Sequence, residues 1–401
     1  MLKAVSDTYR RAYSGLPRDA WALSLILFID MSGTMVIFFL SLYLTRDLGF
    51  SVFQSGQVLS GYGVGTLFGT LLGGMSSDKL GPRRTQQLSL FASGTVLFVL
   101  SFCRNFPSVL AFVFLYGFFV SALFPANAAA MAEVCHPAVR TRGFVLNRLA
   151  NNLGATIGPV VGGILASQDY RLLFWVDGTT CILAALSFFI LFPVGRGAVP
   201  TETARRGIKP PAWWKDGYLN GILLASLGVS LVFIQLLSTF PLYIRSVYGF
   251  SEKLIGPLFA VNTVLIVLVQ MVLTHSVERH PHGRIAAVGA ILLGLGFGLM
   301  PFGRGMLYAA LTVVVWTFGE MLIMPTLTTM ISLRAPAGYQ GKYQGLFSLA
   351  FSFGFVLGPA LGTRIYERLG ASTLWVGAAG FSAVISIAFI LLGRMSSDSK
   401  P

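Results

Sequence analysis

Long apolar runs alternate with short polar segments along the whole chain. About 20 apolar residues cross a bilayer as a helix, and the chain contains twelve runs of roughly this length. The first half has runs at roughly 20–44, 54–75, 86–103, 107–134, 143–167 and 171–193. The second half has runs at roughly 218–244, 254–277, 285–302, 306–333, 343–366 and 371–393. The pattern predicts an all-α integral membrane protein with twelve transmembrane helices.

The two sets of runs repeat at a fixed offset of 200 residues. Matching positions include Leu42 and Leu242, Tyr43 and Tyr243, Pro125 and Pro325, and Trp175 and Trp375. So many matches without a gap predict a duplicated unit, a plan known from secondary transporters. We expect pseudo-symmetric six-helix bundles at 1–193 and 218–401, joined by a cytoplasmic linker at 194–217.

Composition and charge support a membrane protein. Hydrophobic residues make up 55% of the chain and charged residues only 11%, against roughly 25% charged residues in soluble domains. A net charge of +14 is compatible with nucleic acid as a partner, but the basic residues lie in short loops between apolar runs. Of the 29 Lys and Arg residues, 20 fall on the side of the two termini and eight on the other. Both termini are therefore expected to be cytoplasmic, with no nucleic-acid partner.

The predicted fifth and eleventh spans carry small residues four positions apart. Such a ridge lets another helix approach closely within lipid, and a proline inside it bends the helix. The packing motif comprises Gly154, Gly158, Pro159, Gly162 and Gly163, and it recurs as Gly354, Gly358 and Pro359. We expect this bent, smooth-faced helix to support movement of one half against the other.

A charged loop is expected after the second span. A carboxylate there can face the positive end of a neighbouring helix, and the basic side chains can pair with acids or lipid phosphates. The candidate gating residues are Gly74, Asp78, Lys79, Gly81, Arg83 and Arg84. Asp78 and Arg83 are predicted to close the cytoplasmic side by engaging the other bundle.

Ionisable residues inside membrane spans are costly and mark functional sites. Asp30 lies near the middle of the first span, and Glu320 lies midway along the tenth. Desolvation favours the neutral carboxyl, so both are candidates for proton coupling, with Asp30 preferred. For Asp30 the alternatives are a local hydrogen bond to Ser32 or Thr34 and a permanent pair with a base. For Glu320 the alternative is a structural pair or a packing hydrogen bond near Pro325.

Other polar groups are candidates for a substrate cavity. Arg148, in the fifth span, has three open roles: it neutralises Asp30 or Glu320, it holds an anionic substrate group, or it reaches the cytoplasmic interface. Further cavity candidates are Asn151, Asn152, Tyr116, Asn127, Gln235 and Asn262. Asp177 lies close to a span end and is expected to be interfacial.

Enzyme chemistry is not expected. The sequence has no convincing nucleophile–base–acid arrangement and no Walker-type phosphate loop. Its three cysteines lack metal-type spacing, so no metal site is expected. The chain is predicted to need no cofactor and to draw energy from an ion gradient, with protons as the default ion.

The chain resembles a major facilitator superfamily transporter of the twelve-helix drug:proton antiporter branch. The stretch from Gly74 to Arg84 is similar to the superfamily signature between the second and third helices. The stretch from Gly154 to Gly163 resembles the fifth-helix motif of the family's antiporters. Gly319-Glu320, Pro325 and 341–345 look like the tenth-to-eleventh-helix pattern of bacterial exporters. The resemblance implies the major facilitator fold, a monomer, and a coupling acid on the first helix.

We therefore expect a proton-coupled exporter of small lipophilic or amphipathic compounds, of the multidrug-efflux type. It would work by alternating access in a bacterial-type inner membrane, with its substrate, protons and membrane lipid as partners. The first alternative is an exporter or flippase of an amphipathic anion such as a lysolipid, metabolite or siderophore. The second is a membrane receptor or scaffold without transport activity.

Overall fold

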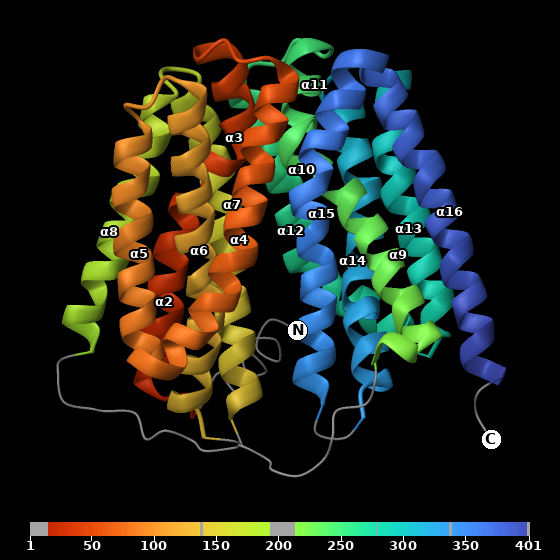
Figure 1. Ribbon diagram of the computed structural model, residues 1–401, viewed down its shortest axis with the longest axis horizontal. Helices are drawn as coiled ribbons and strands as arrows, with labels where there is room; N and C mark the ends of the chain where they lie inside the picture. The colour runs from red at the N-terminus through yellow and green to blue at the C-terminus, as the bar shows by residue number, and fades with distance from the viewer. Residues whose placement is uncertain (1–14, 137–138, 193–212, 278, 337–338, 399–401) are drawn as a thin grey trace, which may run out of the picture. The chain divides into compact units, whose positions relative to one another are not determined.

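The computed structural model describes residues 15–136, 139–192, 213–277, 279–336 and 339–398 (Figure 1). Within these residues every regular element is a helix and none is a strand. Most of the predicted linker at 194–217 lies outside the described residues.

The first half contains the helices of the first six predicted spans, and each predicted run coincides with one helix or one broken helix. They are α2 (Arg18–Gly33), α3 (Val36–Leu42), a π-helical turn η1 (Tyr43–Asp47), α4 (Val52–Leu80), α5 (Pro82–Leu100), α6 (Phe106–Val134), α7 (Arg140–Ala166) and α8 (Arg171–Leu191). The first span is therefore interrupted, which the continuous apolar run did not predict.

The second half repeats this order. After a short 3₁₀ turn η2 (Trp213–Lys215), the helices are α9 (Gly217–Phe233), α10 (Gln235–Ser238), α11 (Phe240–Ser246), α12 (Glu252–Val277), α13 (His282–Gly298) with a 3₁₀ turn η3 (Met300–Phe302), α14 (Met306–Arg334), α15 (Gln340–Leu369) and α16 (Ala371–Asp398). The seventh span, like the first, is broken into pieces.

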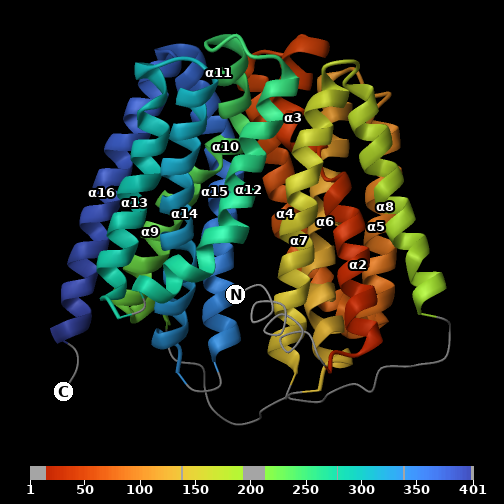
Figure 2. The ribbon, with the colours of Figure 1, turned by 180° about the vertical axis from the view of Figure 1, so that it is seen from behind.

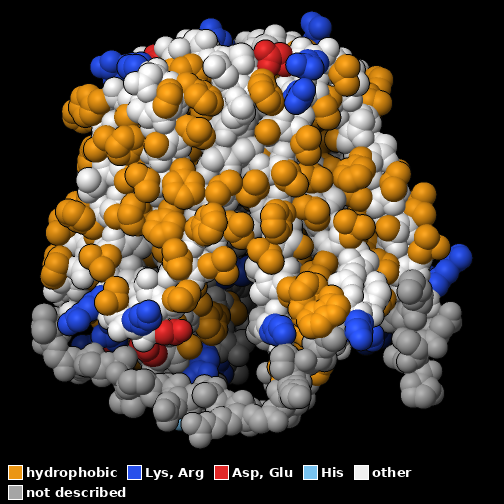
Figure 3. Space-filling model, in the orientation of Figure 1, with side chains coloured by type: hydrophobic (Ala, Val, Ile, Leu, Met, Phe, Trp, Pro, Cys, Tyr) orange, Lys and Arg blue, Asp and Glu red, His pale blue; other side chains and the backbone are white. Residues whose placement is uncertain are grey.

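Eleven helices of the described chain are long and apolar enough to cross a membrane. The remaining predicted span is the third, at 86–103. It coincides with α5, which is not among these eleven helices and carries Arg83, Arg84, Gln86 and Gln87 in its first two turns. Large apolar side chains face outward, and Ile190 and Met271 are each 80% exposed. On the face seen in Figure 3, hydrophobic side chains cover the middle of the helices and charged ones gather near the helix ends. This surface suits lipid rather than water.

The chain forms two compact units. The first comprises Met1–Val36 and Gly65–Thr201, and the second comprises Ile37–Val64 and Glu202–Pro401. In the second unit α3 contacts α12 through Phe38 and Phe259, whose ring centroids are 4.9 Å apart. The predicted division into 1–193, 194–217 and 218–401 stays a prediction from the sequence repeat.

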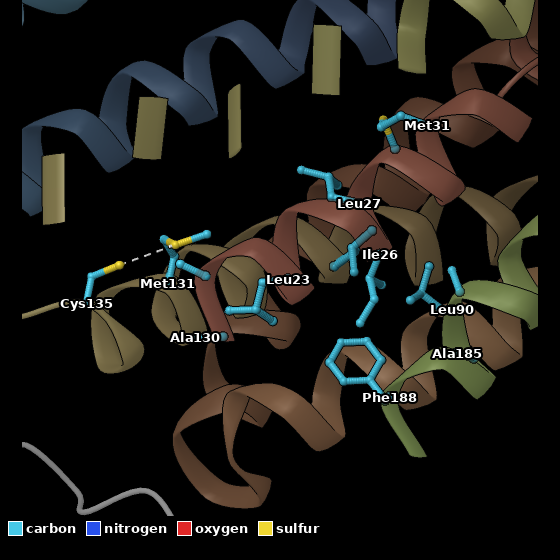
Figure 4. Close-up of a cluster of buried hydrophobic side chains, with 13 residues drawn as sticks. Leu23, Ile26, Leu27, Met31, Leu90, Ala130, Met131, Cys135, Ala185 and Phe188 are labelled. Carbon is cyan, nitrogen blue, oxygen red and sulfur yellow. Dashed lines mark hydrogen bonds between the residues drawn. The ribbon is translucent and has the colours of Figure 1, made fainter. Parts of the chain in front are cut away.

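The first unit is built around α2. This helix packs against α6, α7 and α8, while α5 packs against α6 and α8 (Figures 1 and 2). Figure 4 shows the buried contact, in which Leu23, Ile26 and Leu27 of α2 meet Leu90 of α5 and Phe188 of α8. Fully burying such a side chain contributes about 1.5–3 kcal/mol, so this cluster fixes α2 inside the unit.

The second unit has an aromatic core on α13. Phe297 stacks on Trp316 of α14, with ring centroids 5.6 Å apart, and on Trp375 of α16, at 5.5 Å. Tyr243 of α11 contacts the same Trp375 edge-on at 5.6 Å. These rings connect the broken seventh span to three other helices.

Glycines of the repeated packing motif face the broken helices. A Cβ added at Gly154 would lie 2.6 Å from the Cβ of Met31, and one at Gly158 would lie 2.5 Å from the carbonyl oxygen of Thr34. In the second unit the motif glycine Gly354 meets Ser230 of α9 in the same way. Only glycine allows these backbones to lie so close together.

Asp216 joins the N-terminus of α9 to the C-terminus of α14. Its carboxylate accepts hydrogen bonds from Arg334 Nε at 2.7 Å and Nη2 at 3.1 Å, and from the Leu219 N–H at 3.1 Å. Partial burial acts to raise the pKa of Asp216, but these donors outweigh it and hold the pKa below its usual range. The ionised carboxylate is therefore the form that stabilises this corner.

Substituting Gly158 by Ala is expected to destabilise the protein by about 1–3 kcal/mol, because the new methyl group forces the α2 backbone away. Gly377, inside α16, has open space around its Cα, so Gly377→Ala serves as the matched control. That control should be neutral or stabilising by about 0.5–1 kcal/mol, because Gly is unfavourable in a helix interior. Thermal unfolding of the purified protein in detergent measures both. Equal melting temperatures for the two variants would contradict the packing argument.

Asp216→Asn keeps a good N-cap acceptor but removes the charge. Because the folded pKa of Asp216 is lowered, its stabilising contribution is complete above the unfolded pKa of about 3.9 and is lost as the pH falls through the folded value. The variant should be less stable than wild type at neutral pH by about 0.5–1 kcal/mol and equal to it in strong acid. Melting curves over a pH series test this, and a pH-independent difference would be evidence against it.

Candidate functional site

A buried carboxylate holds the break in the first membrane helix. Between α2 and α3, Thr34 has an extended backbone with ψ of 91°, so the N–H groups that follow lose their helical partners. Asp177 of α8 supplies a partner, because its Oδ2 accepts hydrogen bonds from the N–H groups of Met35 and Val36, both at 3.1 Å. Asp177 is completely buried, and a carboxylate is favoured at the start of a helix.

Asp177 is expected from the sequence to be interfacial, and the structure shows that it is buried against the break in the first helix; its depth in the membrane stays a prediction. Its position close to a span end in the sequence gave no sign that it packs against another helix. The observable signal is the mismatch between the halves, since the residue 200 positions later is Gly377.

Asp30 lies in the same cluster. Its Oδ1 accepts a hydrogen bond from the Cys181 thiol at 3.4 Å, and the same sulfur lies 3.8 Å from Oδ1 of Asp177. Asp30 is 1% exposed, and its Oδ2 is buried without a hydrogen-bond partner among the described residues. The structure thus brings two carboxyls and one thiol together inside the first unit.

The local alternatives for Asp30 are not what the structure has. The Ser32 hydroxyl donates to the Phe28 carbonyl at 2.7 Å, and the Thr34 hydroxyl donates to the backbone carbonyl of Asp30 at 3.2 Å. Neither hydrogen bond involves the carboxyl group.

Over the described part of the chain there is no grouping of three His, Cys, Asp or Glu side chains suited to a metal ion.

Glu320 and Asn262, predicted separately, are partners in the second unit. Asn262 of α12 donates to Oε2 of Glu320 at 2.8 Å and to the Thr317 hydroxyl at 3.1 Å. The Thr317 hydroxyl in turn donates a hydrogen bond to the Val313 carbonyl at 2.6 Å. Glu320 is only partly exposed and accepts a neutral hydrogen bond, so it is a second carboxyl suited to protonation.

Gln235 holds the break in the seventh membrane helix. Its amide nitrogen donates to the Gly358 carbonyl at 2.9 Å, and its amide oxygen accepts from the hydroxyls of Ser238 at 3.1 Å and Thr239 at 3.0 Å. These contacts tie the break to α15 with neutral groups alone. Gln235 is 4% exposed, so its observed role is structural.

Of the other cavity candidates, Tyr116 and Asn127 are buried. Asn127 donates to Gln86 of α5 at 3.0 Å and accepts from Asn147 of α7, which links three helices. Arg148 of α7 is exposed, while Asn151 and Asn152 beside it are half-buried. Whether any of these residues binds substrate stays a prediction.

The expected gating loop is mostly helical. Residues from Gly74 to Leu80 complete α4, and the turn is confined to Gly81, whose φ of 86° favours glycine. Arg83 donates to Asp19 at 2.9 Å and lies 4.3 Å over the ring of Phe192. These contacts lie within the first unit, and Asp78, Lys79 and Arg84 are exposed. A contact with the other bundle stays a prediction.

Duplicated sets of membrane helices, each with an interrupted first helix, are a plan known from secondary transporters. A family model described as the Major Facilitator Superfamily matches residues 22–359. The chain belongs to the Major Facilitator Superfamily.

Three comparisons illustrate this relationship. YttB of Bacillus subtilis (strain 168), an uncharacterized MFS-type transporter, is 27% identical over 81% of this chain and 83% of its own length. The Na(+), Li(+), K(+)/H(+) antiporter of Planococcus maritimus is 25% identical over 79% of this chain and 81% of its own. The nucleoside transporter NupG shares the fold, with a TM-score of 0.79 over 93% of this chain and 98% of NupG at 16% identity. These proteins are transporters and not enzymes, as the sequence predicted for this chain.

Proposed function

We propose that this transporter is a proton-coupled exporter of small lipophilic or amphipathic compounds. The observation that supports the proposal most is Asp30, whose Oδ2 is buried without a partner in the described structure. An ionised carboxylate in that position is costly, whereas a protonated one is tolerated. Exchange of a proton at Asp30 for a substrate would couple export to the proton gradient, with no cofactor needed.

The exchange would proceed by alternating access. When the site is open to the outside, Asp30 takes up a proton; when it is open to the cytoplasm, the proton leaves and the substrate binds. Glu320, with Asn262 as its hydrogen-bond donor, is the second candidate for the coupling acid. The transporter would work as a monomer in a bacterial-type inner membrane, with both termini cytoplasmic.

Two further facts support proton-coupled antiport. The Planococcus maritimus relative is named as a cation/H(+) antiporter. The fifth-helix motif that resembles the antiporter motif packs directly on the first membrane helix. Gly154 lies against Met31, the residue after Asp30, and Gly158 lies against Thr34 at the break. The relative's name makes Na⁺ and K⁺ competing cargoes, so a test must include them.

An amphipathic anion is a second candidate cargo because of Arg148. This guanidinium is exposed on α7, six residues before the motif glycine Gly154, inside a helix long and apolar enough to span a membrane. A cation there can hold an acidic headgroup. The two proposals differ in the charge of the compound and share the same fold.

Asp30→Asn is expected to abolish substrate-driven proton flux, because the amide cannot carry the exchanged proton. The measurement uses proteoliposomes with an imposed pH gradient and an internal pH-sensitive dye. The added compounds are lipophilic cations, zwitterions, a lysolipid, Na⁺ and K⁺. Asp169→Asn, the same change at an exposed carboxylate, is the matched control and should retain flux. Flux that persists in Asp30→Asn but vanishes in Glu320→Gln would move the coupling to Glu320. Crossing of labelled lysolipid without proton flux would favour a flippase.

Arg148→Ala is expected to abolish export of anionic compounds and to spare or improve export of cations. The reason is that a positive charge attracts an acidic headgroup and repels a cationic one. Arg142→Ala removes an exposed charge from the same helix and serves as the control. Rates for a matched anion and cation pair in proteoliposomes give the readout. Unchanged rates for every compound in Arg148→Ala would remove Arg148 from substrate binding.

A further inference from the structure

The two broken membrane helices differ in one respect, which is the charge of the group that holds them. The break between α2 and α3 is held by the carboxylate of Asp177. The break that follows α9 is held by the amide of Gln235 and two hydroxyls. Both serve the same requirement, because a backbone polar group without a partner is costly within a membrane: Asp177 accepts from N–H groups, whereas Gln235 donates to the carbonyls of Leu231 and Gly358. Only the first break can therefore respond to a proton.

The duplication strengthens this contrast. All three ionisable groups of the first cluster are replaced by neutral ones at the 200-residue offset. Asp30 corresponds to Ser230, Asp177 to Gly377 and Cys181 to Phe381. The cluster is thus a property of the first half and not a requirement of the shared fold.

The hydrogen bonds assign different roles to the two carboxyls. Oδ2 of Asp177 accepts two backbone N–H groups, whereas Oδ2 of Asp30 accepts none from the described residues. A negative charge is therefore best placed on Asp177 and a proton on Asp30. The Cys181 thiol lies between them, and two charges linked so closely titrate as a pair.

Among the described residues, the ionisable groups that act on Asp177 are Asp30 and Cys181. Its own helix contributes Cys181 and α2 contributes Asp30. From α5, Gly94 faces the neighbouring Gly178, and from α7, Gly154 and Gly158 face Met31 and Thr34. Arg148 of α7 is exposed and lies six residues before Gly154.

We propose that Asp177 is a positioning residue whose proton controls the break in the first membrane helix. With one proton on the cluster, Asp30 is neutral and the Asp177 carboxylate holds the N–H groups of Met35 and Val36. A second proton neutralises Asp177 and weakens both hydrogen bonds, since charged acceptors bind N–H groups about twice as strongly as neutral ones. Val36 is the last residue of the first compact unit and Ile37 opens the second, so the loosened segment is the one where the chain leaves the first unit. This inference deepens the proposed function and rests on it for its role in transport.

Hydrogen–deuterium exchange of the two breaks tests the inference without a transport assay. Peptides covering 33–37 and 233–240 are followed over a pH series from acid to neutral, and rates are divided by the intrinsic exchange rates. In wild type, protection of 33–37 should rise roughly tenfold as Asp177 ionises. Protection of 233–240 should stay constant, which makes the second break an internal control.

Variants separate this inference from the proposed function. Asp177→Asn should give pH-independent protection at 33–37, because the amide oxygen still accepts but no longer titrates. Asp30→Asn should keep the step, since Asp177 remains next to a neutral group, although it is expected to lose proton-coupled export. Flat protection at 33–37 in wild type, an equal step at 233–240, or a step that survives in Asp177→Asn would overturn the inference. If Asp177→Asn does not fold, the contrast in protection between 33–37 and 233–240 in wild type still supports or overturns the inference. Coupled export by Asp30→Asn, with the step intact, would refute only the proposed coupling role of Asp30.

Discussion

The need to give every backbone polar group a partner inside a membrane governs the interrupted first helix of each half of this transporter. A continuous helix meets that need by itself, but the first and seventh membrane helices are interrupted. At the first interruption the partner is the carboxylate of Asp177, which reaches the N–H groups of Met35 and Val36 from α8. At the second interruption Gln235 donates to the carbonyls of Leu231 and Gly358 and accepts from the hydroxyls of Ser238 and Thr239. The first break is thus held from another helix, whereas the second combines local hydrogen bonds with one contact to α15.

Close packing complements these polar contacts. Gly154 and Gly158 of α7 lie against Met31 and Thr34, directly on the first break. Hydrophobicity alone does not join helices in lipid, so small residues supply the contact area. Because a side chain at Gly158 would displace the Thr34 carbonyl, the glycine face and the Asp177 carboxylate fix the same few residues from two sides. Any change in the break must therefore be accommodated by α7 and α8 together.

The fold could be predicted from the sequence because its signals are periodic and repeated. Apolar runs of bilayer length and the 200-residue offset gave the number and order of the helices. The first break could not be predicted, since 31–36 contains no proline and its geometry depends on a carboxylate more than 140 residues away. The second break had a signal in the sequence, because Pro241 lies at the start of α11. The predicted gating loop is largely helix for a related reason, because Gly81 alone provides the turn. Among the site residues, the sequence named Asp30, Glu320 and Asn262, but it did not place Asp177 and Cys181 beside Asp30.

The duplication offers a physical way to separate scaffold from chemistry. Positions that match across the offset, such as Gly158 and Gly358, contact the first helix of their own half and set its distance. Positions that differ carry the carboxyl groups within the spans: Asp30 against Ser230, Asp177 against Gly377, and Glu320 against Val120. A buried carboxyl is costly, and the neutral counterpart in the other half demonstrates that the fold does not need it there. The Asp177 carboxylate offsets part of this cost by accepting the N–H groups of Met35 and Val36. Oδ2 of Asp30 accepts no hydrogen bond from the described residues, so the needs of the fold alone do not account for that carboxyl.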